Sequence, residues 1–340
     1  MIGVLRPAVR QLTHSAVFAR FVGLLERFDG GSPHLLRVLT YHRIAEPDAR
    51  PDLYPNTLSA TPDQFERQMS FLAGRYRVLS MPELEAAWDH DSCLPPRSVL
   101  LTFDDAYRDF GQIAWPVMKR LGLPVTLFVP TAFPDQPQRA FWWDRLHQAV
   151  HASLRRDSLD TPIGRLPLET ADERTAAVRR LTAHVKALPH RGALAAVERL
   201  CVELNAPAAQ NEVLSWNELR ELARQGVTLG AHTRTHPLLN RLSLDEARAE
   251  ALGSREDLER EVGPQPAVLA YPAGGCHQEI ARMLQREGFR FAFTTHRGLN
   301  DVRTADRMLL RRINVGRGTS DAALRGQLLP WMKYAGPRSS

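Results

Sequence analysis

The sequence has few cysteines, no long apolar run and only a small excess of positive charge. Cys93, Cys201 and Cys276 are odd in number, far apart and form no CxxC pair, so neither a thiolate zinc site nor a disulfide framework is indicated. No stretch reaches the ~20 apolar residues that a membrane-spanning helix needs. The net charge of +6 is spread thinly over 340 residues, which favours a globular protein of high pI over a nucleic-acid binder.

The first 34 residues carry no clear export signal. Arg20 interrupts the apolar stretch from Ala16 to Leu25, and no small-residue cleavage site follows it. We therefore predict a helical N-terminal extension over residues 1–34 that packs on the domain, with a position on a membrane surface as the alternative. The predicted location is cytoplasmic or at a membrane surface. Residues 321–340 are predicted to form a C-terminal tail.

Short apolar runs alternate with helical patterns along the chain. Hydrophobic residues make up 44% of the chain, which excludes disorder throughout, and continuous apolar runs are typical of strands buried on both faces of a parallel sheet. Capping serines such as Ser215 and Ser243 mark helix starts between them. The alternation predicts an α/β fold with a (β/α) barrel over residues 35–320. The predicted strands are Leu35–Tyr41, Tyr76–Leu79, Ser98–Phe103, Val125–Val129, Val227–Ala231, Ala267–Tyr271, Phe289–Thr294 and Leu310–Val315.

The stretch from about 133 to 214 breaks this alternation. It contains no strand-like run and many helix-forming residues, so we predict a helical insertion in one βα connection. Loops at the carboxyl ends of barrel strands commonly carry function. The insertion is therefore expected to lie over the barrel mouth and to shape a binding cleft there.

Two motifs that follow predicted strands carry chemistry. Asp104 and Asp105 are neighbouring carboxylates that repel each other unless a cation or a proton intervenes, although aspartates also favour plain turns and helix caps. His232 and His236 can reach one cation if their segment turns helically; two solvated loop histidines are the alternative. Together the motifs predict a metal site of two histidines and one carboxylate, in which the second aspartate is free to act as a base.

These motifs resemble those of the polysaccharide deacetylases (carbohydrate esterase family 4), whose NodB-homology fold is a distorted or incomplete (β/α) barrel. The resemblance covers roughly 35–320 apart from the insertion. It implies a metal-dependent hydrolase of carbon–nitrogen bonds other than peptide bonds, which removes acetyl groups from N-acetylated amino sugars in a polysaccharide or its precursor. The segments that carry the resemblance are TFDD at 102–105, HTRTH at 232–236, AYPAG at 270–274 and TTHRGLN at 294–300.

The resemblance also implies a role for each motif residue. Asp104 is then the general base, and the residues that hold a divalent metal are Asp105, His232 and His236. Zinc is the favoured metal, with cobalt, manganese and nickel as alternatives. The backbone N–H of Tyr271 is the expected donor to the oxyanion.

The general acid departs from the common family pattern. Many members place it in a late Leu-x-x-His motif, and no such motif follows residue 300. Instead, the first predicted strand ends in Leu-Thr-Tyr-His at 39–42. This resembles a permuted subgroup that includes deacetylases of poly-N-acetylglucosamine, so His42 is expected to protonate the leaving amine. A structural histidine that caps the loop is the alternative.

Five side chains are candidates for substrate contact: Trp142, Trp143, His296, Arg311 and Arg312. The tryptophans could stack on sugar rings or pack the insertion onto its domain. The histidine could enter the pocket mouth or stay exposed in its loop. The arginine that often precedes the third family motif is missing, so one of the two arginines is also a candidate for orienting Asp104. Because they are adjacent on a strand, the other must face away.

Several alternatives to this function follow from the same residues. The scaffold could deacylate an O-acetyl ester, a lipid-linked sugar or a non-sugar amide. The chain could also be a catalytically inactive relative that only binds carbohydrate. A nucleic-acid partner is not expected, since no recognised nucleic-acid motif is present. The expected partner is a carbohydrate that carries N-acetyl groups.

Overall fold

The computed structural model describes Thr13 and residues 15–334, with the exception of 91, 92, 138, 156 and 208. The start of the predicted N-terminal extension and the end of the predicted tail therefore lie outside the described residues. Among the residues that are described, no helix is long and apolar enough to cross a membrane. The three cysteines are unpaired.

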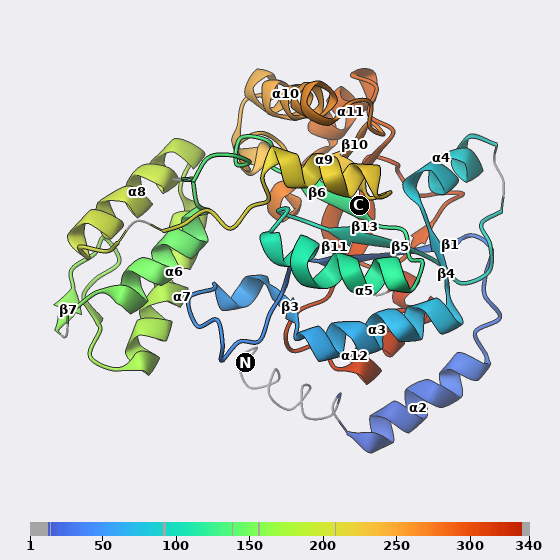
Figure 1. The fold of residues 1–340 in the computed structure, drawn as a ribbon, viewed down its shortest axis with the longest axis horizontal. Coiled ribbons are helices and arrows are strands. Elements are labelled where there is room, and N and C mark those ends of the chain that lie inside the picture. The colour runs from blue at the N-terminus through green and yellow to red at the C-terminus, as the bar shows by residue number, and fades with distance from the viewer. Residues whose placement is uncertain are drawn as a thin grey trace.

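A closed barrel of parallel strands lies at the centre of the described part of the chain (Figure 1). The seven strands that the described residues contribute to this ring follow the order β1-β13-β11-β10-β9-β6-β5, and β1 closes it by pairing with β5. The predicted (β/α) barrel is confirmed. The strands are β1 (Leu35–Tyr41), β5 (Ser98–Phe103), β6 (Thr126–Val129), β9 (Thr228–Ala231), β10 (Val268–Ala270), β11 (Phe291–Arg297) and β13 (Leu310–Asn314).

Shorter strands lie outside this ring. The remaining predicted strand, β4 (Arg77–Leu79), pairs with the first half of β5. In addition, β12 (Asn300–Asp301) runs antiparallel to the start of β1, and β2 (Arg43–Ile44) pairs with β3 (Leu58–Ala60). These last three strands were not predicted, because two or three residues are too few to show an alternating pattern.

The inside of the barrel changes character along the strands. Because side chains alternate across a strand, every second residue of a strand faces the same side. Near the amino ends this side is apolar and includes Leu36, Val38, Leu100, Phe291 and Leu310. Further along the same strands, on the same side, come three fully buried polar residues, Thr40, Thr102 and Arg312. The carboxyl end of the barrel is therefore polar inside.

Helices cover the outside of the barrel (Figure 1). The predicted capping boxes at Ser215 and Ser243 are both present. The helices are α2 (Ala16–Arg27), α3 (Pro62–Arg75), α4 (Met81–Asp89), α5 (Trp115–Arg120), α9 (Trp216–Arg224), α10 (Leu244–Val262), α11 (Gln278–Arg286) and α12 (Asp321–Gln327). Short turns of helix are η1 (Pro55–Thr57), η2 (Phe110–Ala114), η3 (Leu239–Arg241), η4 (Pro272–Gly274) and η5 (Pro330–Tyr334).

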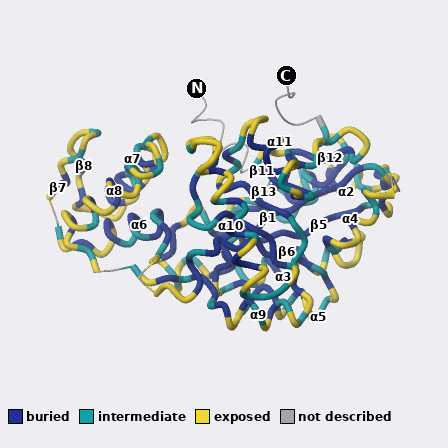
Figure 2. The backbone as a smooth tube through the Cα atoms, turned by 90° about the horizontal axis from the view of Figure 1, so that it is seen from above, coloured by how far each residue is buried: buried dark blue, intermediate teal, exposed yellow. Residues whose placement is uncertain are grey.

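A helical lobe stands beside the barrel, between β6 and β9 in the chain (Figures 1 and 2). It contains a small hairpin where the sequence predicted no strand, since two-residue strands leave no pattern. Arg43 of β2 donates to Asp144 of the lobe at 2.9 Å in a buried ion pair, and Trp143 donates to the Tyr107 hydroxyl at 3.1 Å. These contacts hold the lobe against the barrel. Its elements are α6 (Trp142–Ala152), β7 (Ser158–Leu159), β8 (Leu166–Pro167), α7 (Ala171–Ala187) and α8 (His190–Glu203).

Candidate active site

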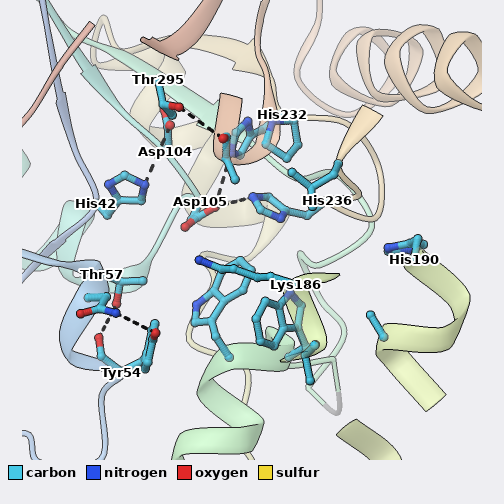
Figure 3. Close-up of a pocket in the computed structure, with 18 of the residues that line it drawn as sticks. His42, Tyr54, Thr57, Asp104, Asp105, Lys186, His190, His232, His236 and Thr295 are labelled. Atoms are coloured by element: carbon cyan, nitrogen blue, oxygen red, sulfur yellow. Dashed lines mark hydrogen bonds and ion pairs between the residues drawn. The ribbon is translucent and has the colours of Figure 1, made fainter. Parts of the chain in front are cut away.

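The carboxyl ends of the barrel strands and the lobe line a pocket of about 530 Å³ (Figure 3). This volume lies within the range of about 300–1,000 Å³ that is typical of small-molecule sites. The barrel brings together in it all five side chains that the sequence predicted as acid, base or metal ligand: His42, Asp104, Asp105, His232 and His236.

Asp105, His232 and His236 form a compact group in this pocket. Their ligand-type atoms lie within 4.8 Å of one another, and Asp105 Oδ1 is 3.5 Å and 3.3 Å from the Nε2 atoms of His232 and His236. His232 Nδ1 lies 2.7 Å from the carbonyl oxygen of Ala270. Since a carbonyl only accepts, Nδ1 carries a proton, and in the neutral imidazole that a metal ligand requires, Nε2 keeps a free lone pair. The buried Asp105 Oδ1 accepts no hydrogen bond from the described residues.

The spacing of His232 and His236 in the sequence allows a helical turn between them. The loop that carries these two histidines is not helical in the structure. Thr233 and His236 have φ values of 63° and 60°, and Asp105 has one of 73°. Such values cost of order 1–3 kcal/mol in residues other than glycine and are concentrated at functional sites. The His236 N–H donates to Thr233 Oγ1 at 3.1 Å, and Glu250 of α10 accepts two loop N–H groups at 2.8 and 2.9 Å. These contacts offset the strain.

Asp104 lies beside this group and is held by an arginine. Arg312 of β13 donates to both carboxylate oxygens of Asp104, at 2.8 and 2.7 Å, and to the Thr294 carbonyl oxygen at 2.8 Å. Arg312 is fully buried and does not line the pocket, so its predicted contact with substrate is wrong. Arg311 instead exchanges backbone hydrogen bonds with the side chain of Asn300, and it does not line the pocket either.

His42 follows β1 and approaches the same carboxylate. Its Nε2 is 4.0 Å from Asp104 Oδ2, and 29% of its side chain is exposed. Its backbone N–H donates to Ser59 Oγ at 2.9 Å, which fixes the base of the side chain. In Figure 3, His42 lies on one side of the two aspartates and the other two histidines lie on the opposite side. His296 is exposed and lies outside the pocket lining, which matches the alternative that it stays exposed in its loop.

The position of Tyr271 corrects the predicted oxyanion donor. Its backbone N–H donates to the carbonyl oxygen of Phe293 at 2.9 Å, which extends the pairing of β10 with β11. Its hydroxyl donates to the carbonyl oxygen of Met308 at 2.9 Å, and the side chain is buried. Tyr271 therefore stabilises the barrel wall, and its N–H is not free to bind a negative charge in the pocket.

The two tryptophans at the start of α6 both line the pocket. Trp143 is buried: its ring stacks on Phe141 with centroids 4.5 Å apart and meets the His236 ring edge-on at 5.0 Å. Trp142 is only half-buried, and both tryptophans also line a neighbouring hollow of about 660 Å³. Trp143 therefore packs the lobe onto the barrel, whereas Trp142 is accessible to a ligand.

Several lining residues were not predicted from the sequence. Tyr54, Asn56 and Thr57 come from the connection between β2 and β3, and Asn56 donates its amide to the Tyr54 hydroxyl at 2.8 Å. Lys186 and His190 come from the lobe, at the end of α7 and the start of α8. The composition of a loop or of an amphipathic helix does not show which part meets a pocket, so no sequence signal could have found them.

Burial raises the pKa of each of the two aspartates, and the groups around each carboxyl lower it. Burial raises the pKa of Asp104, but the Arg312 guanidinium and the nearby imidazoles outweigh it, so that the net shift is downward. Burial also raises the pKa of Asp105, and the two adjacent imidazoles hold it well below its usual range. Both carboxyls are therefore ionised at neutral pH, as a metal ligand or a proton acceptor must be.

Ionised carboxylates and imidazoles around an open pocket at the carboxyl end of a (β/α) barrel are the components of a hydrolytic site. The sequence model of the polysaccharide deacetylase family matches residues 171–292 of this chain. The predicted relationship to that family is confirmed. The predicted enzyme class, a hydrolase of carbon–nitrogen bonds other than peptide bonds, is confirmed with it.

Individual relatives match over most of the chain. YxkH of Bacillus subtilis, named as a polysaccharide deacetylase, is 22% identical over 292 residues, which are 86% of this chain and 75% of YxkH. The Streptococcus pyogenes deacetylase PplD, solved in complex with acetate, has a TM-score of 0.59 and 19% identity over 87% of this chain and 99% of its own. IcaB from Ammonifex degensii has a TM-score of 0.57 and 18% identity, and the match covers 86% of this chain and 97% of IcaB. At these identities the solved structures show a shared fold.

Proposed function

We propose that this protein is a metal-dependent hydrolase that removes acetyl groups from N-acetylated amino sugars in a polysaccharide or its precursor. The observation that carries the proposal is the group formed by Asp105, His232 and His236 beside Asp104 in an open pocket. A set of metal-type ligands next to a proton acceptor provides one established way to hydrolyse an unactivated amide. The family match supports an acetylated carbohydrate as the substrate.

The residues of the Asp105 group fit a divalent metal. Asp105 Oδ1 is buried without a hydrogen-bond donor among the described residues, and His232 is fixed with a free lone pair on Nε2. One carboxylate oxygen and two imidazole nitrogens suit zinc, with cobalt, manganese and nickel as alternatives. A metal held by these atoms would polarise the acetyl carbonyl and lower the pKa of a bound water.

Asp104 acts in this proposal as the general base. Arg312 donates to both of its oxygens, so the carboxylate cannot rotate freely, yet each oxygen keeps a further lone pair for another proton. Asp104 takes the proton of the water that attacks the acetyl carbonyl. Arg312 does not line the pocket, so it is a positioning residue that acts through Asp104.

His42 acts as the general acid. An amine leaves the tetrahedral intermediate only when its nitrogen gains a proton, and His42 lines the pocket close to Asp104. The nitrogen of the scissile amide receives the His42 proton as the carbon–nitrogen bond breaks. The products are acetate and a free amino sugar.

Replacing His42 by alanine should lower turnover of an N-acetyl substrate by about 10²–10⁴-fold, the usual range for a positioned acid. Metal content should stay unchanged, because His42 is not one of the three proposed ligands and lies on the other side of the aspartates from His232 and His236. An ester substrate, whose leaving alkoxide needs less help than an amine, should be affected less. Steady-state acetate release on both substrates measures this. Near-normal amide turnover in His42→Ala, together with an inactive His296→Ala, would transfer the role to His296.

Replacing Trp142 by alanine should raise KM for an oligosaccharide by about 3- to 10-fold with little change in kcat, because a sugar ring stacked on an indole loses contact worth about 0.5–1.5 kcal/mol. Trp331 is a matched control, since it is half-exposed and lies outside the pocket lining. Trp331→Ala should leave both constants unchanged. An effect of Trp142→Ala on kcat alone would contradict a role in substrate binding.

The proposed function is tested by acetate release from a panel of substrates, with and without added zinc, cobalt, manganese or nickel. We expect metal-stimulated release from N-acetylated oligosaccharides. Preferential release from O-acetyl esters, lipid-linked sugars or non-sugar amides would identify one of the alternative deacylases. Tight oligosaccharide binding without acetate release under any metal would identify an inactive carbohydrate-binding relative.

A further inference from the structure

Helix α2 carries an apolar stripe on its exposed side. Val17, Phe21, Leu24 and Phe28 are 76%, 55%, 50% and 79% exposed. Successive residues of this set are four, three and four positions apart, which places them on one face of the helix. Phe28 is the C-cap residue, and its backbone angles are still helical, so it extends the same face. Of the nine large hydrophobic side chains exposed in the described part of the chain, four are gathered here.

The opposite side of α2 is packed, so the stripe is not needed to attach the helix. Val22 is buried and faces Gly326 of α12. A methyl group placed on Gly326 would lie 3.4 Å from Val22 Cγ2, so the two helices are in close contact here. Glu26 accepts a hydrogen bond from Arg325 Nε at 2.8 Å. Arg97 donates to the Glu26 carbonyl oxygen at 3.4 Å. The helix is therefore fixed on the domain with its apolar stripe turned outward.

The charge beside the stripe is positive. Arg20 and Arg27 are exposed, lie four and three residues from Leu24, and form no ion pair with any described residue. Glu26 is the one acidic residue of α2, and Arg325 neutralises it. Residues 1–14 add two arginines and no aspartate or glutamate. An apolar face bordered by unpaired basic residues is the composition of helices that lie in the surface of an anionic bilayer.

We propose that α2 docks the protein on an anionic lipid bilayer, with the stripe among the lipid headgroups and with Arg20 and Arg27 against their phosphates. A second copy of the chain is a poorer occupant. Two copies that met through this face would bring arginine against arginine with no acidic residue to pair them.

The C-terminal end of the docking face lies at the opposite end of the barrel from the pocket. The C-terminal end of α2 contacts Arg97, which immediately precedes β5, and thus lies at the amino ends of the barrel strands. The pocket is at the carboxyl ends of the same strands. The end of α2 that carries Leu24, Arg27 and Phe28 is therefore directed away from the pocket.

Sedimentation of the full chain with lipid vesicles tests the proposal. Vesicles of phosphatidylcholine that contain about a quarter phosphatidylglycerol should bind the protein about 10-fold more tightly than phosphatidylcholine alone. The double variant Phe21→Gln, Phe28→Gln should bind the anionic vesicles about 10-fold more weakly, because two rings no longer enter the headgroup region. The double variant Arg20→Gln, Arg27→Gln should lose the preference for anionic vesicles.

A matched control removes two exposed apolar side chains from the lobe. Leu154 and Val202 are 86% and 71% exposed, and their joint replacement by glutamine should change vesicle binding by less than about twofold. All variants should unfold at the wild-type temperature, since the altered side chains are exposed. Equal binding by the wild type to both vesicles, or undiminished binding by the phenylalanine variant, overturns the proposal. A solution dimer that the phenylalanine variant converts to a monomer also overturns it.

Discussion

Asp104→Asn should lower turnover by about 10⁴-fold, the upper end of the range for a general base, while the metal stays bound. Asparagine keeps the size of the side chain but cannot take up the proton of the attacking water. Acetate release gives the turnover, and elemental analysis of the purified variant gives the metal content. Because the change leaves the buried Arg312 charge without its partner, at a cost of about 3–5 kcal/mol, the unfolding temperature must be measured as well.

Asp105→Asn is the matched variant. Asp105 Oδ1 lies 3.3 Å and 3.5 Å from the Nε2 atoms of His236 and His232. Unlike Asp104→Asn, this change should therefore lower the metal content of the protein. High metal concentration should restore part of the activity of Asp105→Asn and none of that of Asp104→Asn. Equal loss of metal from both variants would show that the two aspartates do not have separate roles.

His232→Ala should reduce acetate release to the level of metal-free protein, a larger effect than the roughly 10²–10⁴-fold loss of a single acid or base. The reason is that His232 supplies one of the three proposed ligand atoms, and the Ala270 carbonyl holds its ring in the tautomer that a ligand needs. Metal content by elemental analysis and activity across a range of metal concentrations measure the effect.

His296→Ala is the control for this experiment. His296 is exposed and lies outside the pocket lining, so its loss should leave both metal content and turnover unchanged. Treatment of the wild type with a chelator should reproduce the His232→Ala result, and added metal should reverse it. Full metal occupancy in His232→Ala would refute the proposed ligand set.

The residues at strand ends could be predicted because buried parallel strands leave a recognisable pattern. The continuous apolar run from Ser98 to Phe103 shows where β5 ends, and the polar residues after it must lie at the rim of the barrel. The same argument places His42 after β1 and His232 after β9. In a closed ring all parallel strands end on one side, so residues far apart in the sequence meet there.

Contacts that depend on register or on helix packing could not be predicted. A shift of one residue in β13 would turn Arg311 inward in place of Arg312. Whether the N–H of Tyr271 is free depends on how far the pairing of β10 with β11 extends past Ala270. The entry of Lys186 into the pocket depends on how the lobe helices pack together, which no local pattern in the sequence determines.

Closure of the barrel through β1 has a consequence for the nascent chain. β1 is the earliest strand of the ring to be synthesised, yet it pairs with β13, the last of them. Arg312 stands on β13, 208 residues after the carboxylate that it holds. Until the ribosome has released β13, the apolar inner face is open and Asp104 lacks the arginine that holds it. A chain truncated before residue 310 should therefore be recognised by chaperones and proteases as unfinished, and it should not show partial activity.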